Sequence, residues 1–339
     1  MKKLNKFLSG LLFVGSCTAQ AGLVAPPNAV WVFGDSFSDA GNLFALTGGT
    51  PGAPYSEGRF SNGPVWVQQF ASAFGLTADA SNKNLGTNYA VGGAQAGTGN
   101  TLDPLFPFLP DTGMSNQVDS FLASPVSAND AFNAGSLFIV HAAGNDYQRW
   151  TNFSDLVLMQ AVVDNTVQTL GGLITGLHNV AGAMQFLVPN MHGFSQADDW
   201  VFGTLPTFRS FSQAFNTALA TEVSDLRTQL GVTIIEVDLF SLFDQLLANP
   251  SNFGFTNIAT PCLNLSASFG FESLCGNPEK HLYWDAIHPT TKTHQFIADA
   301  ALAAVPVPAA LPLFAGALLG LAGGIRRFRT SATVEVKVD

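Results

Sequence analysis

The feature that most constrains this chain is a short apolar run, residues 29–33, that ends abruptly at Gly34-Asp35-Ser36. Its continuous hydrophobicity is typical of a strand that is buried on both faces of a parallel sheet. A serine just past such a strand lies where open α/β sheets bind their ligands. Gly34 permits a sharp turn, and a helix after it would point its first N–H groups at the same place. Taken alone, the motif also fits an ordinary helix cap.

The composition narrows the class of protein. The chain has 339 residues, of which 47% are hydrophobic and 11% are charged, which allows a large core and argues against intrinsic disorder. Its formal net charge of -10 argues against nucleic acid and against an anionic membrane surface as partners. The composition therefore predicts a globular protein with no nucleic-acid partner.

The N-terminus has the three regions of a secretory signal peptide. A basic start at residues 1–3 precedes an apolar run at 7–14, and Ala19-Gln20-Ala21 fits a cleavage site. We expect cleavage after Ala21, so that residues 1–21 are lost and the protein is exported. Residues 14–17 faintly resemble a lipoprotein cleavage site, but the later site fits better.

Cysteine content points to a disulfide. Cleavage after Ala21 removes Cys17 and leaves Cys262 and Cys275, which are 13 positions apart in a loop rich in Gly, Asn and Ser. Two cysteines in an exported chain suggest that they are bonded to each other. We therefore predict a disulfide between Cys262 and Cys275.

The C-terminus carries a second segment that looks like a processing signal. Two prolines at residues 305–308 would end the preceding helix, and residues 309–325 are uncharged and are followed by Arg326, Arg327 and Arg329. Seventeen residues are the lower limit for a membrane-spanning helix, and the arginines stand where a cytoplasmic flank would be. A buried core helix is the alternative interpretation.

This tail resembles the PEP-CTERM class of bacterial sorting signals in its Val-Pro-x-Pro-Ala variant. The resemblance implies that residues 305–329 hold the exported protein in the inner membrane of a Gram-negative bacterium until a sorting protease acts. The protein would then reach the cell surface or the medium. Residues 330–339 extend past the arginines as a short tail.

Between the two ends, the hydrophobic pattern predicts one α/β domain over residues 22–304. Helical patterns separate most of the apolar strand candidates, which implies parallel βαβ units in a three-layer α/β/α sandwich. The strand candidates are 29–33, 86–91, 136–142, 184–188 and 232–237, and the helical patterns cover 64–74, 154–178, 207–230 and 290–304. Residues 94–135 and 249–284 are rich in Pro, Gly and Asn, and we expect them to form long loops over one edge of the sheet.

Three residues at predicted strand ends or in loops could form a nucleophilic site. A serine hydroxyl is a weak nucleophile until a base takes its proton, and His288 could be that base for Ser36. Asp285 lies three residues before His288, so a single turn can place its carboxylate against the other ring nitrogen. The sequence thus predicts a Ser36, His288 and Asp285 triad.

An anionic intermediate on such a serine needs hydrogen-bond donors that converge on it. Candidates are the N–H of Ser36, the N–H of Gly93 and the side-chain amide of Asn145. Gly93 closes the second strand candidate, and Asn145 follows the third within Gly144-Asn145-Asp146. We expect these three residues to form an oxyanion hole.

These blocks together resemble the SGNH family of hydrolases, also called GDSL lipases and esterases. The resemblance rests on residues 34–42, 88–93, 144–146 and 285–289, in that order, and covers nearly all of residues 29–300. It implies a five-stranded parallel, flavodoxin-like sheet in the order 2-1-3-4-5, no cofactor or metal, and ester hydrolysis through an acyl-serine. Residues 58–64 and the cysteine-bearing loop resemble the long, lipase-like branch of the family.

Several alternatives stay open at this point. His281, Asp285 and His288 could be metal ligands, but no obvious further ligand lies near them in the sequence. His141 could be a second base, although a packing role fits a strand end better. The substrate would be an acyl ester or a lipid, and the acyl group could pass to water or to another alcohol. A non-catalytic surface or matrix binding protein on the same scaffold is the alternative from a different class.

Overall fold

The structure is a computed structural model that describes residues 26–82, 86–193, 205–266 and 270–305. The predicted signal peptide at 1–21 and the predicted sorting segment at 305–329 with its tail lie outside these residues, apart from Val305. Among the residues described, no helix combines the length and apolar character needed to cross a membrane. Apart from Val305, the described residues all belong to the predicted domain over residues 22–304.

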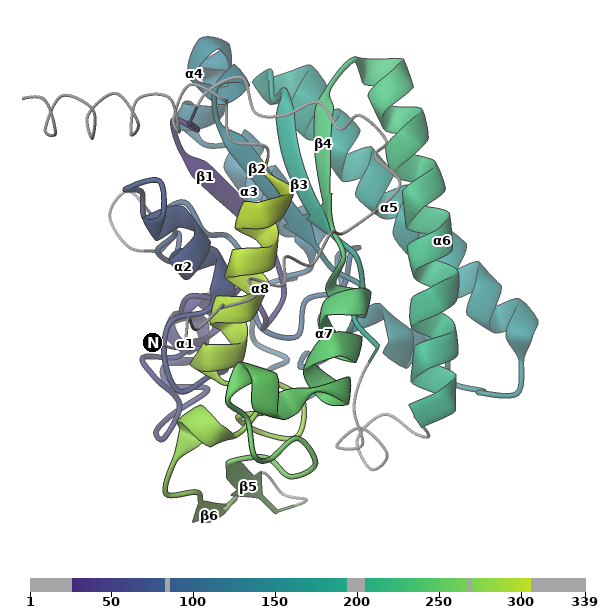
Figure 1. The fold of residues 1–339 in the computed structure, drawn as a ribbon. Coiled ribbons are helices and arrows are strands. Elements are labelled where there is room, and N and C mark those ends of the chain that lie inside the picture. The colour runs from purple at the N-terminus through teal and green to yellow at the C-terminus, as the bar shows by residue number, and fades with distance from the viewer. Residues whose placement is uncertain (1–25, 83–85, 194–204, 267–269, 306–339) are drawn as a thin grey trace, which may run out of the picture.

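The centre of the molecule is a parallel sheet of four strands in the order β1-β2-β3-β4 (Figure 1). The strands are β1 (Val30–Gly34), β2 (Leu137–His141), β3 (Gln185–Pro189) and β4 (Thr233–Val237). All but two of their residues are buried, as the continuous apolar runs predicted. Because the strands are parallel, their carboxyl ends lie at one edge of the sheet, and the segments that follow β1 and β2 meet there.

The predicted fifth strand at 86–91 is not a regular strand in the structure. Thr87 and Tyr89 exchange backbone hydrogen bonds with Val32 on the free edge of β1, and Asn88 forms isolated bridges with Val32 and Ala80. The side chain of Asn88 accepts the N–H of Ala90 at 2.9 Å, a local bond of the kind that competes with extended pairing. The segment thus occupies the position of the outer strand in the predicted 2-1-3-4-5 order without its regular ladder.

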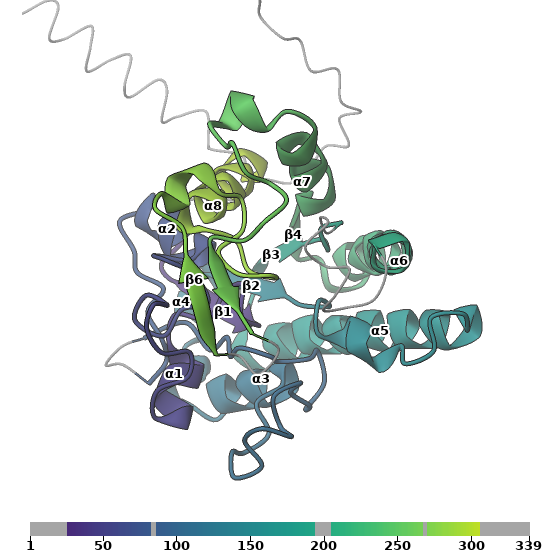
Figure 2. The ribbon, with the colours of Figure 1, turned by 90° about the horizontal axis from the view of Figure 1, so that it is seen from below.

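Helices cover both faces of the sheet, which confirms the three-layer α/β/α prediction. Helices α2 and α8 pack together on one face near α7, whereas α3, α5 and α6 cover the other face (Figure 2). The helices are α1 (Asn42–Thr47), α2 (Trp66–Ser72), α3 (Met114–Leu122), α4 (Asp130–Ala134), α5 (Leu156–Ala181), α6 (Leu205–Leu230), α7 (Leu239–Ala248) and α8 (Thr291–Ala304). The four predicted helical patterns correspond to α2, α5, α6 and α8.

The expectation of a long loop over 94–135 is wrong in part. Residues 114–122 form α3, whose buried residues include Met114, Val118 and Phe121 at helical spacing. Phe121 packs its ring against Trp31 and Phe33 of β1, with centroids 5.0 and 5.7 Å apart. The nine residues of α3 are too few for their pattern to stand out between Pro- and Gly-rich flanks.

Residues 249–284 contain a short antiparallel hairpin in place of an unbroken loop. Its strands are β5 (Leu263–Leu265) and β6 (Phe271–Leu274), and the structure joins Cys262 and Cys275 at its base as a disulfide. Cys262 packs with Leu263 and Trp284 in a small apolar cluster of its own, separate from the main core. The hairpin is therefore tied directly to the segment that carries Asp285 and His288.

Buried titratable groups gather near the carboxyl ends of the strands. Burial lowers the pKa of His141 to about 4, and it lowers the pKa of His192 and of His294 to about 3, with nearby histidines adding to the effect for these two. Burial also raises the pKa of Asp35 and of Asp39 to about 6. The three histidines are therefore neutral rings at neutral pH.

These shifts predict how stability depends on pH. An unfolded histidine binds a proton near pH 6.5, so each buried histidine favours unfolding as the pH falls from about 6.5 to its folded pKa. Asp35 and Asp39 oppose this between about pH 6 and 4, because their folded pKa lies above the unfolded value of 3.8. Asp146, whose pKa burial also raises, opposes it in the same sense. Because the folded pKa of the histidines lies further below 6.5 than the folded pKa of Asp35 and Asp39 lies above 3.8, we expect stability to fall on acidification through this window.

Replacement of one of these histidines should flatten that dependence. In His141→Phe, the slope of unfolding free energy against pH between 6.5 and 4 should decrease by up to about 1.4 kcal/mol per pH unit, because the variant binds one proton fewer on unfolding. Urea unfolding at a series of pH values measures the slope. Phe138→Leu, on the same strand, is the matched control: it should lower stability at every pH and leave the slope unchanged. An unchanged slope in His141→Phe would contradict the assignment.

Candidate active site

The turn that carries Ser36 is held in place by contacts at the end of β1. The amide of Gln117 from α3 receives the N–H of Gly34 and donates to its carbonyl, both at 2.9 Å. A Cβ on Gly34 would lie only 2.9 Å from the carbonyl oxygen of His141 on β2. A residue without a side chain is therefore needed where β1 passes β2 and turns toward Ser36.

The structure brings Ser36, His288 and Asp285 into one hydrogen-bonded chain. Ser36 Oγ lies 2.8 Å from His288 Nε2, across 252 positions of sequence. The other ring nitrogen, Nδ1, lies 2.9 and 2.8 Å from the two carboxylate oxygens of Asp285. A carboxylate only accepts hydrogen bonds, so Nδ1 carries the ring proton and Nε2 is left to accept the serine proton. This is the geometry of a serine whose proton a histidine can take.

Asp285 keeps its charge although it is buried. Burial alone would raise its pKa, but the charge and hydrogen bond of His288 and a hydrogen bond from Tyr55 outweigh this, and the pKa lies below its usual value. Asp285 Oδ1 also accepts the backbone N–H groups of Ile287 and His288 at 2.8 and 2.7 Å. These local bonds close the turn that the spacing of Asp285 and His288 predicted.

Of the predicted oxyanion donors, the side chain of Asn145 lines the same cavity as Ser36, and its amide has two acceptors within the protein. Asn145 Nδ2 donates to the carbonyl of Ala94 at 3.0 Å and lies 3.4 Å from Asp35 Oδ2, which places the amide between the segments that hold Ser36 and Gly93. Gly93 has a φ of 82°, and a Cβ there would lie 2.2 Å from Asn100 Oδ1. Within the described ranges, neither the N–H of Ser36 nor that of Gly93 has a hydrogen-bond acceptor. Both donors are therefore free to bind an oxyanion.

Two further carboxylates hold the loops in which these residues lie. Asp39 accepts four backbone N–H groups, from Gly41, Asn42, Leu43 and Gly92, at 2.6–3.1 Å. Asp146 accepts the N–H of Ala96 at 3.0 Å. The Asp39–Gly92 and Asp146–Ala96 bonds tie the loops that follow β1 and β2 to the 88–96 segment. These groups shape the site and do not reach Ser36.

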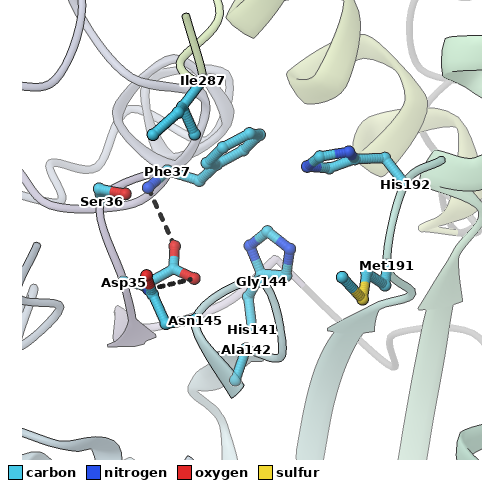
Figure 3. Close-up of a pocket in the computed structure, with 10 residues that line it drawn as sticks. All are labelled: Asp35, Ser36, Phe37, His141, Ala142, Gly144, Asn145, Met191, His192 and Ile287. Atoms are coloured by element: carbon cyan, nitrogen blue, oxygen red, sulfur yellow. Dashed lines mark hydrogen bonds between the residues drawn. The ribbon is translucent and has the colours of Figure 1, made fainter. Parts of the chain in front are cut away.

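A small cavity of about 30 Å³ opens beside Ser36 at the carboxyl ends of β1, β2 and β3 (Figure 3). Asp35 and Asn145 form its polar side, while His141, Met191 and His192 line the opposite side. The ring of His192 stacks on Phe37 with centroids 4.9 Å apart. A lowered pKa makes both of these rings weak bases, and His288 Nε2 lies 2.8 Å from Ser36 Oγ, so His288 is the base that the described site offers to Ser36.

Two aromatic contacts of the triad were not predicted from the sequence. The hydroxyl of Tyr55 donates to Asp285 Oδ2 at 2.6 Å, and the ring of Phe60 lies against His288 with centroids 4.7 Å apart. Phe60 belongs to residues 58–64, which the sequence marked only by their resemblance to the lipase-like branch, and Tyr55 lies three residues before them. Nothing in their spacing shows that this segment reaches a loop some 230 positions away.

Metal binding does not fit this arrangement. The described residues hold no group of three or more His, Cys, Asp and Glu side chains placed to bind a metal ion. His281, the third proposed ligand, has its Nδ1 at 3.2 Å from the carbonyl of Thr260. His288 uses both ring nitrogens for Ser36 and Asp285, so the triad geometry accounts for this cluster.

The chain is similar to several known proteins. The chain is 28% identical over 288 residues to the thermolabile hemolysin of Vibrio parahaemolyticus, covering 80% of this chain and 62% of the hemolysin. It is 25% identical over 345 residues to the phosphatidylcholine-sterol acyltransferase of Aeromonas hydrophila, covering 88% of this chain and 96% of that protein. Among solved structures, an acetylxylan esterase from Geobacillus stearothermophilus aligns with a TM-score of 0.44 at 11% identity, over 85% of this chain and 98% of that one.

The family comparison covers most of the chain. The model of the GDSL-like Lipase/Acylhydrolase family matches residues 30–301, a range that begins at β1 and ends within α8. The match includes Ser36, Gly93, Asn145, Asp285 and His288. The chain therefore belongs to the GDSL-like lipase/acylhydrolase family and is a carboxylic ester hydrolase.

Proposed function

We propose that this protein hydrolyses carboxylic esters through an acyl-serine on Ser36, with His288 as general base and acid and Asp285 as the orienting carboxylate. The observation that carries the proposal is the unbroken chain of hydrogen bonds from Ser36 Oγ through both ring nitrogens of His288 to Asp285. A serine in that chain loses its proton to a neutral imidazole as it attacks, which is the requirement for a serine nucleophile.

The first half of the reaction forms the acyl-serine. Ser36 Oγ attacks the ester carbonyl carbon while its proton moves to His288 Nε2, and Asp285 stabilises the imidazolium through Nδ1. The carbonyl oxygen becomes an oxyanion that the N–H groups of Ser36 and Gly93 and the amide of Asn145 bind. His288 then gives its proton to the leaving alkoxide as the C–O bond breaks.

The second half returns the enzyme to its starting state. His288 takes a proton from a water molecule, whose oxygen attacks the acyl carbon, and Ser36 leaves with the proton that His288 returns. An alcohol in place of water would give acyl transfer by the same steps. The similarity to a phosphatidylcholine-sterol acyltransferase supports this second outcome as a variant of the same proposal.

The surroundings of the site favour an apolar acyl group or a lipid as substrate. Thr101 donates its N–H to the Gly93 carbonyl at 2.9 Å, and the loop that follows exposes Leu105 by 57% and Phe108 by 70%. Exposed large apolar side chains beside a site commonly mark a binding surface. Because this loop is hydrogen-bonded to Gly93 at its start, we propose that its apolar side chains shelter a hydrocarbon chain from water.

We also propose that the protein is exported and that its chain is divided as the sequence suggests. Residues 1–21 would be a signal peptide, residues 22–304 the hydrolase domain and residues 305–329 a membrane-held sorting segment followed by the tail at 330–339. The disulfide between Cys262 and Cys275 supports an oxidising compartment. The family match, which ends at residue 301, supports a boundary near Ala304.

The nucleophile assignment predicts a complete loss of covalent labelling. Ser36→Ala should abolish ester hydrolysis and labelling by a fluorophosphonate probe, because it removes the attacking oxygen and little volume. Circular dichroism should show an unchanged fold. A wild-type protein that is not labelled would favour a non-catalytic binding protein on this scaffold, and a labelled Ser36→Ala variant would show that another serine is the nucleophile.

The oxyanion assignment predicts a change in turnover with little change in binding. Asn145→Ala should lower kcat by roughly 10²–10³ with little change in KM, as for the loss of one oxyanion donor. Steady-state kinetics on a nitrophenyl ester measure both constants. A raised KM with unchanged kcat would make Asn145 a residue that binds substrate equally in the ground and transition states.

The proposed boundary at Ala304 predicts that the domain does not need the C-terminal segment. A chain that ends at Ala304 should be soluble and should keep full activity on a water-soluble ester. In the native host, mass spectrometry should show a mature protein that lacks Arg326, Arg327 and Arg329. Unfolding of the truncated chain would make residues 309–325 a core helix, and retention of the arginines would leave a membrane anchor without processing.

A further inference from the structure

Among the residues that the structure describes, Tyr55 supplies the one donor to the triad carboxylate that comes from outside the Asp285–His288 loop. Asp285 Oδ1 accepts two backbone N–H groups of its own turn, whereas Oδ2 is bonded only by Tyr55, at 2.6 Å, and by His288 Nδ1, at 2.8 Å. His288 Nδ1 also lies 2.9 Å from Oδ1, but without the phenol Oδ2 would have no partner other than the ring that the carboxylate orients.

The phenol is held firmly in this position. Its ring meets those of Phe60 and Trp284 edge-on, with centroids 6.1 and 6.2 Å apart. It also packs against the small cluster that contains the Cys262–Cys275 disulfide. Burial, followed by the nearby Asp285 carboxylate, raises the pKa of Tyr55 above its usual value, so the hydroxyl stays protonated and can only donate to the carboxylate.

The segment that carries Tyr55 is itself anchored to the fold. Arg59 Nε donates to Gln68 of α2 at 2.7 Å, and Arg59 Nη1 donates to the carbonyl of Ser56 at 3.3 Å. One residue further on, the ring of Phe60 packs on His288. The same short stretch of chain thus contacts both the carboxylate and the imidazole of the triad.

We propose that Tyr55 is a positioning residue of the ester-hydrolysis reaction, which acts through Asp285 by fixing the carboxylate so that it holds His288 toward Ser36. The inference rests on the proposed triad chemistry and adds to it a residue from the other end of the domain. A hydrogen bond to a charged group is among the stronger ones in proteins, and a carboxylate that can rotate orients an imidazole poorly.

The test is Tyr55→Phe, which keeps the ring and its packing and removes only the hydroxyl. We expect kcat to fall about tenfold on a nitrophenyl ester with KM unchanged. A tenfold change corresponds to part of the free energy of a hydrogen bond to a charged group. The acidic limb of the pH–rate profile should move to higher pH, because a carboxylate that has lost a donor concentrates its charge on its remaining partner and stabilises the imidazolium more strongly. Tyr89→Phe, which removes the hydroxyl of another half-buried tyrosine, whose ring packs on Phe33 and Phe121, is the control and should change neither.

A double-mutant cycle separates action through Asp285 from direct contact with substrate. In an Asp285→Ala background, Tyr55→Phe should have no further effect on the rate of fluorophosphonate labelling, since its partner is gone. Equal effects in both backgrounds, a rise in KM alone, or a Tyr55→Phe enzyme with wild-type kinetics would each overturn the proposal. Wild-type labelling at Ser36 shows independently that the proposed function holds.

Discussion

The hydrogen bond between Ser36 and His288 joins the end of the first strand to a loop that precedes the last helix. These residues are 252 positions apart, and every element between them has to fold correctly for the two atoms to lie 2.8 Å apart. The parallel sheet makes this possible because β1 and β2 run in the same direction and end at the same edge. Helix α8 begins just after His288 and packs on α2, which holds the loop that carries His288 in position.

Buried carboxylates at this edge differ because their surroundings supply different partners. Asp35 and Asp39 are held mainly by backbone N–H groups, which do not overcome burial, so their pKa rises to about 6. Asp285 faces the imidazole of His288 and the phenol of Tyr55, and its pKa falls below the usual value. A carboxylate that has to stabilise an imidazolium must stay ionised, and only the third environment ensures this.

The sequence predicted the elements that are uniformly buried, and it failed for short elements and for a segment whose own side chain competes for backbone hydrogen bonds. Strands β1 to β4 were predicted because a strand buried on both faces has to be apolar throughout. Helix α3 was not predicted because nine residues carry a weak periodic signal. Residues 86–91 were predicted as a strand, but the side chain of Asn88 accepts the backbone N–H of Ala90 in place of regular strand pairing. Apolar content alone does not show whether a backbone N–H bonds to a neighbouring strand or to a nearby side chain.

For the site, the short motifs by themselves determined which residues we propose for the chemistry: Ser36 at a strand end, Asp285 and His288 within one turn, and Gly93 and Asn145 at neighbouring strand ends. These relations are local, or follow from the parallel order of strands, and so they are visible in one dimension. Only the tertiary structure decided that Tyr55 donates to Asp285 and that the disulfide hairpin packs behind it. Those contacts depend on side-chain packing between segments more than 200 positions apart, which no periodicity or spacing in the chain records.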